Sequence, residues 1–382
     1  MTAPVPPGLA DGPVYLDHNA TTPVDPRVVE ALLPCLTTFF GNPSSSHPYA
    51  DVPRAALATA RTQVADLIGA RPAEVVFTAS GSEANLLALR GAVLASGHPR
   101  PHLITQATEH PAVLETCRAL ERLHGAQLTV LPVDAEGLVD PAALAEARTD
   151  DTVLVSVMAA NNETGALQPI AELAALAREC GALFHCDAAQ AAGKIPLDVT
   201  EWGVDLLTVV GHKMYAPKGI AALFVREGVE LEPVVHGGGQ ERGLRAGTEN
   251  VALAVALGAA AHLAAEELAD GSPERIANLR DALHRRLAHA LPDRVRLNGP
   301  AGHRPACRTR STSASTAPSA TNSSPPPPRS PPPPDRPATA APTPRHPYCP
   351  PWAWTPTAPW RPYGCPWGAG PPRPTSKGQQ RH

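Results

Sequence analysis

The chain alternates short apolar segments with longer segments of helical spacing, and this alternation constrains its fold more than any other feature. The apolar segments include Glu74–Thr78, His102–Thr105, Val153–Met158, Ala182–Cys186 and Leu206–Val210. Strands that alternate with helices at this interval indicate a mainly parallel sheet with right-handed crossovers. We therefore predict an α/β fold whose functional residues gather at the carboxyl ends of the strands.

Periodicity and turn residues predict the remaining elements. Helices are expected over Pro26–Leu36, Val52–Ile68, Leu86–Leu94, Ile170–Cys180, Val251–Leu268 and Pro273–Leu291, and further short strands at Val14–Leu16 and Val295–Leu297. A polar turn that ends at Pro23 follows the first of these strands.

Composition divides the chain at about residue 304. The part before this point is rich in Ala, Leu and Val, whereas the part after it consists mostly of Pro, Ser, Thr and Arg. The segment Ser323–Pro334 contains two runs of four prolines. Such a segment cannot supply a packed core, so we expect residues 304–382 to be disordered. A Pro-rich interaction tail of polyproline II type is the alternative.

Charge and cysteine content narrow the functional classes. A formal net charge of -4 gives no nucleic-acid footprint, and the chain has no run of eighteen apolar residues and no signal-peptide pattern. We therefore expect a cytoplasmic protein that binds neither nucleic acid nor membrane. The seven cysteines show no CxxC or metal-type spacing, which favours reduced thiols over disulfides.

Two charged residues stand at the ends of apolar strands. Lys213 follows Leu206–Val210 in the sequence Gly-His-Lys, where burial would lower its pKa and give the usable amine that a Schiff-base lysine needs. A surface lysine after a strand fits the same pattern. Asp187 closes the strand Ala182–Cys186, and a buried carboxylate at this place requires a cationic partner.

Several other segments have the residues of a binding site, and each also fits a simpler interpretation. Glu74–Thr78 leads into a Gly/Ser turn at a helix start, which is either a phosphate seat or an ordinary N-cap. His110 lies beside another helix start, with Thr108 or Glu109 expected as the cap. Asn161 and Asn162 follow a strand, where Asn-Asn is also ordinary turn chemistry. The loop His236–Asn250 is expected to bind an anion or contact a subunit rather than to act as a flexible linker, and Gly41–His47 is either a functional loop or a connector.

Taken together, these residues match one cofactor. A lysine, a carboxylate for a pyridinium nitrogen, a histidine suited to ring stacking, an Asn/Gln pair and a phosphate-type helix start are what pyridoxal phosphate requires. No metal or nucleotide explains all of them. The segments that carry the pattern are Tyr15–Pro23, Thr108–His110, Asn161–Gly165, Asp187–Gln190, Gly211–Lys213 and Arg245–Asn250. In order and spacing they resemble the class V aminotransferase fold of cysteine desulfurases and the related selenocysteine lyases, from about Val14 to Pro300.

This resemblance implies a fold-type I, pyridoxal-phosphate-dependent homodimer. It would convert L-cysteine to L-alanine and deliver persulfide sulfur to an acceptor protein for iron-sulfur cluster or thio-cofactor assembly, with L-selenocysteine as the alternative substrate. The implied organisation is an N-terminal tail over residues 1–13, a large cofactor-binding domain with the N-terminal segment of the small domain over 14–263, an incomplete small α+β domain over 264–303, and the Pro-rich tail over 304–382.

The resemblance also assigns roles residue by residue. Lys213 would be the Schiff-base lysine, His110 would stack on the cofactor ring and move protons, and Asp187 would pair with the ring nitrogen. The ring oxygen would be contacted by Gln190 and Asn162. The phosphate would be contacted by Gly81, Ser82 and His212, and Thr248 would reach the phosphate of the other subunit. Many desulfurases have a serine two residues before His212, where this chain has Val210. One phosphate contact of the family is therefore not expected here, and Val-Gly-His-Lys is similar to the selenocysteine lyases.

The family's second half-site is missing from the sequence. The resemblance implies a nucleophilic cysteine in a Ser-Ala-Cys-like motif and a carboxylate-binding arginine in a Ser-Leu-Gly-Arg-like motif near the C-terminus, and neither motif is present. Cys307, Cys349 and Cys365 have proline-rich or irregular neighbours, so none is assigned as the persulfide cysteine. We expect activity near background for the chain as written, and a catalytically dead cofactor-binding scaffold is the alternative.

A change of reading frame accounts for the missing motifs. The shifted frame is read by joining the third base of each codon to the first two bases of the next codon, with CGN assumed for Arg and TCN for Ser. This frame permits the strings LPNTLNVSF from Ala306–Ser315, GSACHSGTHTPSPVL from Pro334–Cys349 and PAMGLDPDRALAAVRLSLGR from Pro350–Ala369. Tryptophan has a single codon, so Trp352, Trp354, Trp360 and Trp367 force four of these residues, and all four suit the family pattern. The sequence thus predicts a frameshift at about Gly302 to Pro305.

Overall fold

The computed structural model describes residues 4–10, 12–292 and 294–300. The expected Pro-rich tail, the predicted frameshift position and Cys307, Cys349 and Cys365 lie outside these residues. All described residues belong to one compact unit, Met1–Ser319. The domain boundaries proposed from the sequence stay predictions.

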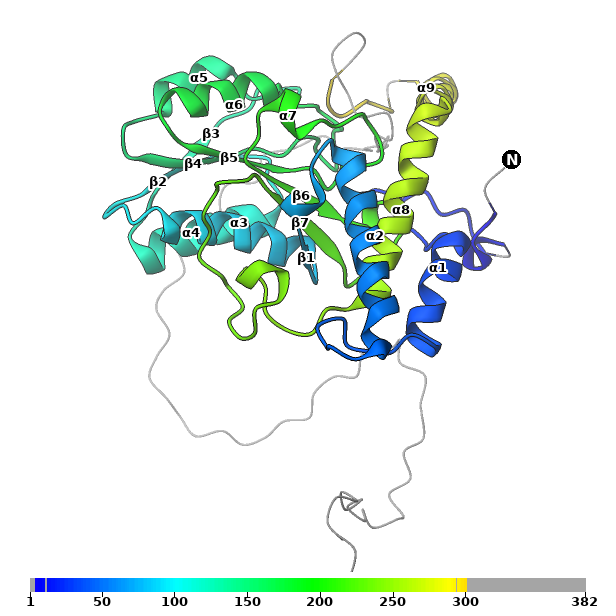
Figure 1. The fold of residues 1–382 in the computed structure, drawn as a ribbon. Helices are drawn as coiled ribbons and strands as arrows, with labels where there is room; N and C mark the ends of the chain where they lie inside the picture. The colour runs from blue at the N-terminus through cyan, green and yellow to red at the C-terminus, as the bar shows by residue number, and fades with distance from the viewer. Residues whose placement is uncertain (1–3, 11, 293, 301–382) are drawn as a thin grey trace, which may run out of the picture. The chain divides into compact units, whose positions relative to one another are not determined.

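A seven-stranded sheet forms the centre of this unit (Figure 1). Its strands are β1 (Val75–Thr78), β2 (His102–Gln106), β3 (Gln127–Leu131), β4 (Thr152–Ser156), β5 (Leu183–Asp187), β6 (Leu206–Val210) and β7 (Ala221–Val225). Their order is β1-β7-β6-β5-β4-β2-β3. The strands from β6 to β3 pair in parallel, and β7 runs antiparallel to both β1 and β6. The predicted α/β fold with a mainly parallel sheet is confirmed.

Helices connect the strands in the described part of the chain. The α-helices are α1 (Pro26–Thr37), α2 (Asp51–Ile68), α3 (Gly81–Ala95), α4 (Pro111–His124), α5 (Pro141–Ala147), α6 (Ile170–Glu179), α7 (Val199–Trp202), α8 (Val251–Ala269) and α9 (Ser272–Ala290). Short 3-10 helices are η1 (Pro7–Leu9), η2 (Pro48–Ala50), η3 (Pro72–Glu74), η4 (Gly211–Lys213) and η5 (Gln240–Gly243). Side-chain caps fix several helix starts, as where Ser80 accepts the N–H of Glu83 at the start of α3.

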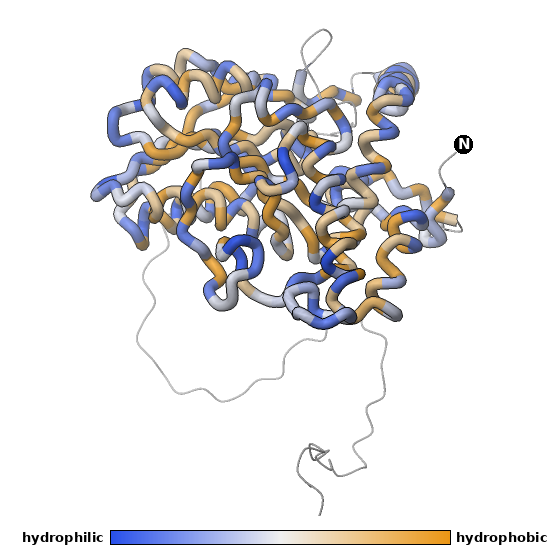
Figure 2. Tube along the Cα trace, viewed as in Figure 1, coloured by the Kyte–Doolittle hydropathy of each residue, from blue (hydrophilic) through white to orange (hydrophobic). Residues whose placement is uncertain are grey.

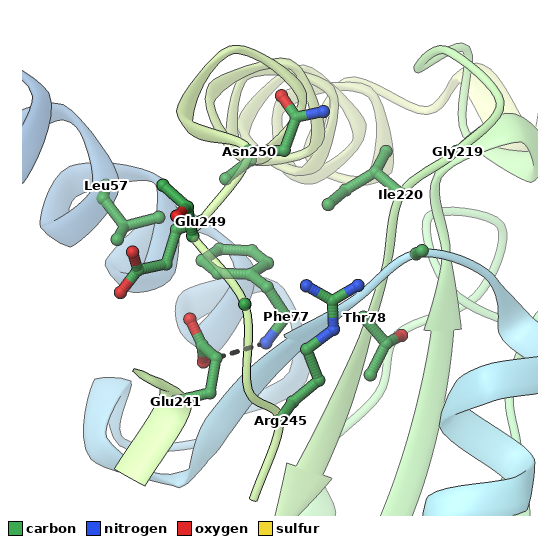
Figure 3. A pocket seen from close by; sticks show the side chains of 13 residues that line it. Leu57, Phe77, Thr78, Gly219, Ile220, Glu241, Arg245, Glu249 and Asn250 are labelled. Atoms are coloured by element: carbon green, nitrogen blue, oxygen red, sulfur yellow. Dashed lines mark hydrogen bonds between the residues drawn. The ribbon is translucent and has the colours of Figure 1, made fainter. Parts of the chain in front are cut away.

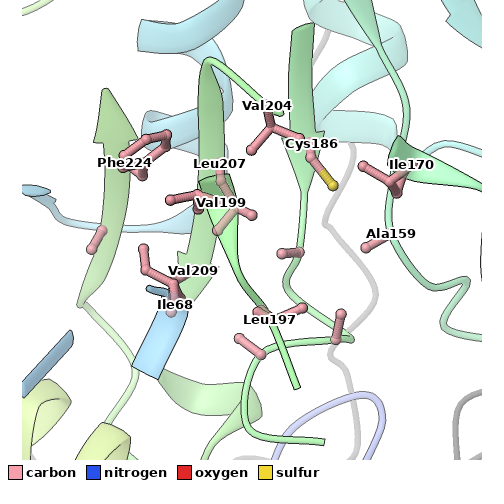
Figure 4. Packing of buried hydrophobic residues seen from close by; sticks show 14 of the residues in the cluster. Ile68, Ala159, Ile170, Cys186, Leu197, Val199, Val204, Leu207, Val209 and Phe224 are labelled. Atoms are coloured by element: carbon pink, nitrogen blue, oxygen red, sulfur yellow. The ribbon is translucent and has the colours of Figure 1, made fainter. Parts of the chain in front are cut away.

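Successive side chains of each strand point to opposite sides of the sheet, and helices cover both faces, so that all strands except the edge strand β3 are mostly buried. On one face α3 and α4 pack on alternate residues of β2, β4 and β6, such as Leu103, Leu154 and Leu206. On the other face Cys186 and Leu207 belong to the larger hydrophobic cluster, which also contains residues of α2, α6 and α8 (Figure 4). The two helical layers are visible in Figure 1, and the strands between them are mostly hydrophobic in Figure 2. This burial fixes the register that brings the strand ends together.

Helix α8 is long and apolar enough to cross a membrane by length and composition alone. Half of its apolar window is buried inside the protein. It packs closely on α2, where a Cβ added at Gly258 would come within 2.6 Å of the Cα of Ala60. In the described structure, the apolar residues of α8 pack tightly against the rest of the protein.

Two sequence predictions of strands are wrong, and two strands and two α-helices were missed. Val14–Leu16 and Val295–Leu297 are irregular, because neither segment pairs with a strand among the described residues, and Val14 is 85% exposed. The missed elements are β3, β7, α5 and α7, for which the residue pattern predicts no strand or helix. The strand β7, Ala221–Val225, is a short apolar segment. Its residues do not indicate whether it pairs in a parallel or an antiparallel direction.

Candidate cofactor site

Lys213 lies at the carboxyl end of β6, in the 3-10 turn Gly211–Lys213. Its Nζ donates hydrogen bonds to the carbonyl oxygens of Asn19 at 2.7 Å and Ala20 at 2.8 Å. Burial lowers the pKa of Lys213 from its usual value, while the negative charges of Asp187 and Asp17 act in the opposite direction. The amine is therefore half-buried, held by neutral carbonyls and easier to deprotonate than a surface lysine.

Asp187 is the last residue of β5, the strand beside β6, and is only 5% exposed. Among the described residues, the donors to its carboxylate are the Asn85 amide, 2.8 Å from Oδ2, and the backbone N–H of Ala189, 3.0 Å from Oδ1. Both donors are neutral. Asp187 is thus buried as the sequence predicts, but the cationic partner expected from the sequence makes no direct contact with it among the described residues, and its charge acts on Lys213 only through the pKa of that residue.

The start of α3 faces the end of β6 at very short range. A Cβ added at Gly81 would come within 2.6 Å of Cγ2 of Val210. Only a residue without a side chain allows this approach. The first-turn N–H groups of Gly81 and Ser82 have no carbonyl partner within their helix, and the positive end of the helix dipole lies there. The start of α3 has the N-cap of the simpler interpretation, Ser80, and its first-turn N–H groups are free of helical partners, so the phosphate seat stays a prediction.

The N-terminal segment covers this group of residues. The carbonyl of Asn19 accepts hydrogen bonds from Lys213 and from Nε2 of Gln190, and its side-chain amide donates to the carbonyl of Asn162 at 3.2 Å. Thr21 contacts Nδ1 of His212 through Oγ1 at 3.1 Å. Burial together with Lys213 and Lys218 lowers the pKa of His212. The chain thus brings Lys213, Gln190, Asn162 and His212 together around the Asn19–Thr21 backbone.

His110 is the N-cap of α4, where its Nδ1 accepts the backbone N–H of Ala112 at 3.1 Å. The expectation that Thr108 or Glu109 caps this helix is wrong, because the imidazole takes the cap position itself. Its exposed ring carries the proton on Nε2 in the neutral form, since Nδ1 is an acceptor.

Glu109, the residue before His110, is buried. Its Oε1 accepts from the backbone N–H of Met158 and from Gln106, while its Oε2 is buried without a partner among the described residues. Burial, and secondarily the charge of Asp187, raises the pKa of Glu109 to about 8. This carboxyl is therefore mostly protonated at neutral pH.

The two neighbouring asparagines have different surroundings. Asn161 is buried, and its Oδ1 accepts the N–H groups of Glu163 and Thr164 while its amide donates to the carbonyl of Thr108. Asn161 therefore shapes the turn. Asn162 is half-buried and meets the site through Asn19. Only Asn162 had been assigned a site role from the sequence.

Thr248 lies on the loop before α8 and lines a separate cavity, which Figure 3 shows with the labelled residues Thr78, Arg245 and Glu249. It lines a cavity of about 250 Å³ together with Thr78, Ala79 and Arg245, and Lys213 and Asp187 do not line this cavity. The Arg245 side chain pairs with Glu83 of α3 at 2.8 Å. Thr248 is exposed and has no contact with Lys213 among the described residues.

Sequence reasoning gave no role to Asn19 or Asn85. Asn19 acts through its backbone carbonyl, which carries no sequence signal. Asn85 follows Gly81 by four residues, and residues at that spacing lie on the same face of a helix. This spacing was the available signal that Asn85 points toward the site.

The residues present fit pyridoxal phosphate. Lys213 supplies an amine of lowered pKa, and Asp187 supplies a buried carboxylate that no cation neutralises by direct contact among the described residues. The start of α3, with Gly81 packed on Val210, supplies first-turn N–H groups for a phosphate. No group of three or more possible metal ligands occurs in the part of the chain that the structure describes.

Comparison with known proteins gives consistent matches. The family model described as Aminotransferase class-V matches residues 14–316. The chain is 47% identical over 291 residues to cysteine desulfurase IscS of Dictyoglomus turgidum, which covers 76% of this chain and 73% of that protein. A solved NifS-like protein has a TM-score of 0.72 at 36% identity, covering 75% of this chain and 78% of that one. A solved structure of SspA in complex with cysteine has a TM-score of 0.63 at 42% identity, covering 65% and 72%.

Proposed function

Because this chain belongs to the class V aminotransferase family, and within it to the pyridoxal-phosphate-dependent cysteine desulfurases, we propose that its site binds pyridoxal phosphate and L-cysteine. The family reaction needs an oriented cysteine thiolate that attacks the substrate sulfur, so that the carbon–sulfur bond breaks, the sulfur stays on that cysteine as a persulfide and L-alanine is the other product. This sequence has no motif for that cysteine, so we propose that the chain keeps the binding site and desulfurates L-cysteine only near background. A similar solved protein, SspA, binds cysteine, which supports this substrate. The observation that carries the proposal is the position of Lys213 and Asp187 at the ends of adjacent parallel strands, β6 and β5, where the charge of Asp187 acts on the pKa of Lys213.

The chain's own residues have distinct tasks in this proposal. When bound, pyridoxal phosphate draws electrons away from the substrate's Cα and so weakens the bonds around it. Asp187 would hold the proton on the ring nitrogen, and the N–H groups of Gly81 and Ser82 would hold the phosphate. Lys213 would hold the cofactor and then exchange a proton, which its lowered pKa makes easier. His110 would exchange a proton through Nε2, because Ala112 occupies Nδ1.

Borohydride reduction tests this assignment. The purified full chain, mixed with pyridoxal phosphate, should become yellow, and reduction should attach the cofactor permanently to the peptide that contains Lys213. Mass spectrometry of the digested protein locates the attachment, and Lys213→Ala with Lys218→Ala as the matched control shows its specificity. A folded protein that stays colourless, or labelling that survives Lys213→Ala unchanged, would overturn the assignment.

We also propose a cytoplasmic homodimer that passes sulfur to an acceptor protein. The position of Thr248 supports the dimer, because this exposed residue lies with Arg245 at a separate cavity and not in the Lys213 group. In a dimer Thr248 would reach the phosphate held by the partner subunit. Light scattering of the cofactor-loaded protein at several concentrations tests the oligomeric state, and a monomer at all of them contradicts it.

A selenocysteine lyase is the second candidate, and Val210 favours it. This residue is 6% exposed and packs on Gly81, so no side-chain hydroxyl is present at that point of the phosphate seat. Val-Gly-His-Lys resembles the selenocysteine lyases. Alanine release should be measured from L-cysteine and from L-selenocysteine with a full-length relative of the same motif. A large preference for L-selenocysteine would replace the first proposal with this one.

A further inference from the structure

We infer that Asn85 is a positioning residue that orients the Asp187 carboxylate toward the cofactor's ring nitrogen and ties it to the helix whose start seats the phosphate. The inference rests on the proposed function, because it requires a cofactor at this site. Asn85 lies on α3 and Asp187 at the end of β5, so the contact joins the helical layer to the sheet.

The contact is short and almost completely shielded from water. Asn85 is 1% exposed and Asp187 is 5% exposed, and Nδ2 of Asn85 lies 2.8 Å from Oδ2 of Asp187. The backbone N–H of Ala189 binds the other carboxylate oxygen, Oδ1, at 3.0 Å. With one donor on each oxygen, the plane of the carboxylate is fixed, and each oxygen still has a lone pair for a further donor.

The donor is neutral, and this determines what it can do. A cationic partner would bind a buried carboxylate more strongly but would neutralise it. The nearby cation, Lys213, directs its Nζ to the carbonyls of Asn19 and Ala20. Asn85 therefore orients Asp187 and leaves its negative charge available for a protonated ring nitrogen.

The other end of the Asn85 amide supports this role. Its Oδ1 is buried and has no hydrogen-bond partner among the described residues, which is unfavourable for a polar atom. The neighbouring residues of α3, such as Ala84 and Leu89, belong to an apolar cluster. An apolar side chain at position 85 would avoid the unpaired oxygen, so the donated hydrogen bond to Asp187 is what the asparagine provides.

Helix α3 also sets the distance between the two parts of the site. Gly81 and Ser82 form its first turn, and Asn85 follows one turn later on the same face. The phosphate seat and the carboxylate clamp are thus two points on one rigid helix. A shift of α3 would move both points together.

The test measures the affinity of full-length variants for pyridoxal phosphate and the pH midpoint of the absorbance change of the bound cofactor. Asn85→Ala should weaken binding about 10- to 100-fold, as expected for loss of a hydrogen bond to a charged group, and should lower the pH midpoint. Asn85→Asp should weaken cofactor binding further at pH 8, because two carboxylates would face each other. The affinity of this variant should increase as the pH is lowered. Leu86→Ala, a truncation of a 36%-exposed side chain on the same helix, is the matched control and should change affinity less than about twofold.

A double-mutant cycle separates positioning from general weakening of α3. In an Asp187→Ala background, Asn85→Ala should cause no further loss of affinity, because its target is absent. If Asn85→Ala does not fold, Asn85→Ser, which retains a small donor, replaces it in the same measurements. An unchanged affinity and pH midpoint, or equal losses with and without Asp187, would overturn the inference. Failure of the wild-type chain to bind the cofactor would instead refute the proposed function.

Discussion

Asp187 is the residue that most sharply distinguishes a cofactor site from an ordinary strand end. Its buried carboxylate has only neutral hydrogen-bond donors in the described structure. Asp187→Ala should therefore weaken pyridoxal phosphate binding by about 2–4 kcal/mol, because the ring's positive charge loses its counter-charge. Titration of the absorbance of the bound cofactor gives the dissociation constant. Asp187→Asn keeps the shape and serves as the control for charge, and unchanged affinity in both variants would show that Asp187 is structural.

Glu109 should make the free energy of unfolding depend on pH. Its pKa is about 8 in the folded chain against 4.5 for an ordinary glutamate. Between these values the folded protein keeps a proton that the unfolded chain has lost, so the contribution is complete below pH 4.5 and disappears as pH rises through 8. Urea unfolding of the cofactor-free protein at pH 5 and pH 9 should show a loss on the order of a few kcal/mol from this group.

Glu109→Gln is the matched variant for this effect. It can still accept the N–H of Met158, but it cannot ionise, so its stability should fall less between pH 5 and pH 9 than that of the wild type. An exposed acid on α4, Glu115, provides Glu115→Gln as the control, which should retain the full fall. Equal pH dependence in the wild type and in Glu109→Gln would contradict the assignment of a raised pKa.

At the scale of elements, α3 approaches β6 so closely that adding a single methyl group to α3 should disturb the contact. Gly81→Ala would bring a Cβ within 2.6 Å of Val210, so α3 must shift, at a cost of about 1–3 kcal/mol in stability. Cofactor affinity should fall with it. Because Val210→Ala makes room for the added carbon, the double variant should recover most of both losses. Thermal unfolding and cofactor titration measure the two effects, and additive losses would argue against the contact.

The sequence predicted elements well where periodicity and strand ends were strong. The helix over Val52–Ile68 is α2 within one residue, and the strand ending in Asp187 is β5. The Val14–Leu16 segment failed because apolar residues form a strand only where a partner is available. The cap at His110 was missed because an imidazole nitrogen can replace the usual Ser, Thr or Asp acceptor.

At the scale of the whole molecule, the parallel sheet explains why separate motifs in the sequence form one site. The strands β5 and β6 deliver Asp187 and Lys213 to one edge, and the spacing of these residues in the sequence predicts that meeting. The contacts of Asn19 with Lys213 and Gln190 were not predictable in the same way, because they use its backbone carbonyl and join residues 194 and 171 positions apart in the sequence. Contacts made by the backbone leave no pattern in the residue types.

The activity of the whole chain depends on the sequence that follows about residue 304. Residues 304–382 lie outside the residues that the structure describes. Their sequence contains no Ser-Ala-Cys-like motif. The chain as written should therefore release alanine from L-cysteine near background, because no oriented thiolate attacks the substrate sulfur and orientation alone contributes several kcal/mol. Robust persulfide formation on Cys307, Cys349 or Cys365 would contradict this.

Resequencing the gene around the codons of Gly302 to Pro305 tests the cause. One or two bases gained or lost there should restore the strings GSACHSGTHTPSPVL and PAMGLDPDRALAAVRLSLGR, and the restored chain should desulfurate L-cysteine while Lys213→Ala in it should not. The matched control is the restored chain with its single GSAC cysteine changed to serine, which should bind the cofactor normally but form no persulfide, because the cofactor residues and the nucleophile belong to different segments. If the shifted frame encodes other residues, the frameshift explanation is wrong. If the frame is confirmed as written, the protein is a natural cofactor-binding relative of the desulfurases that lacks the family's nucleophile.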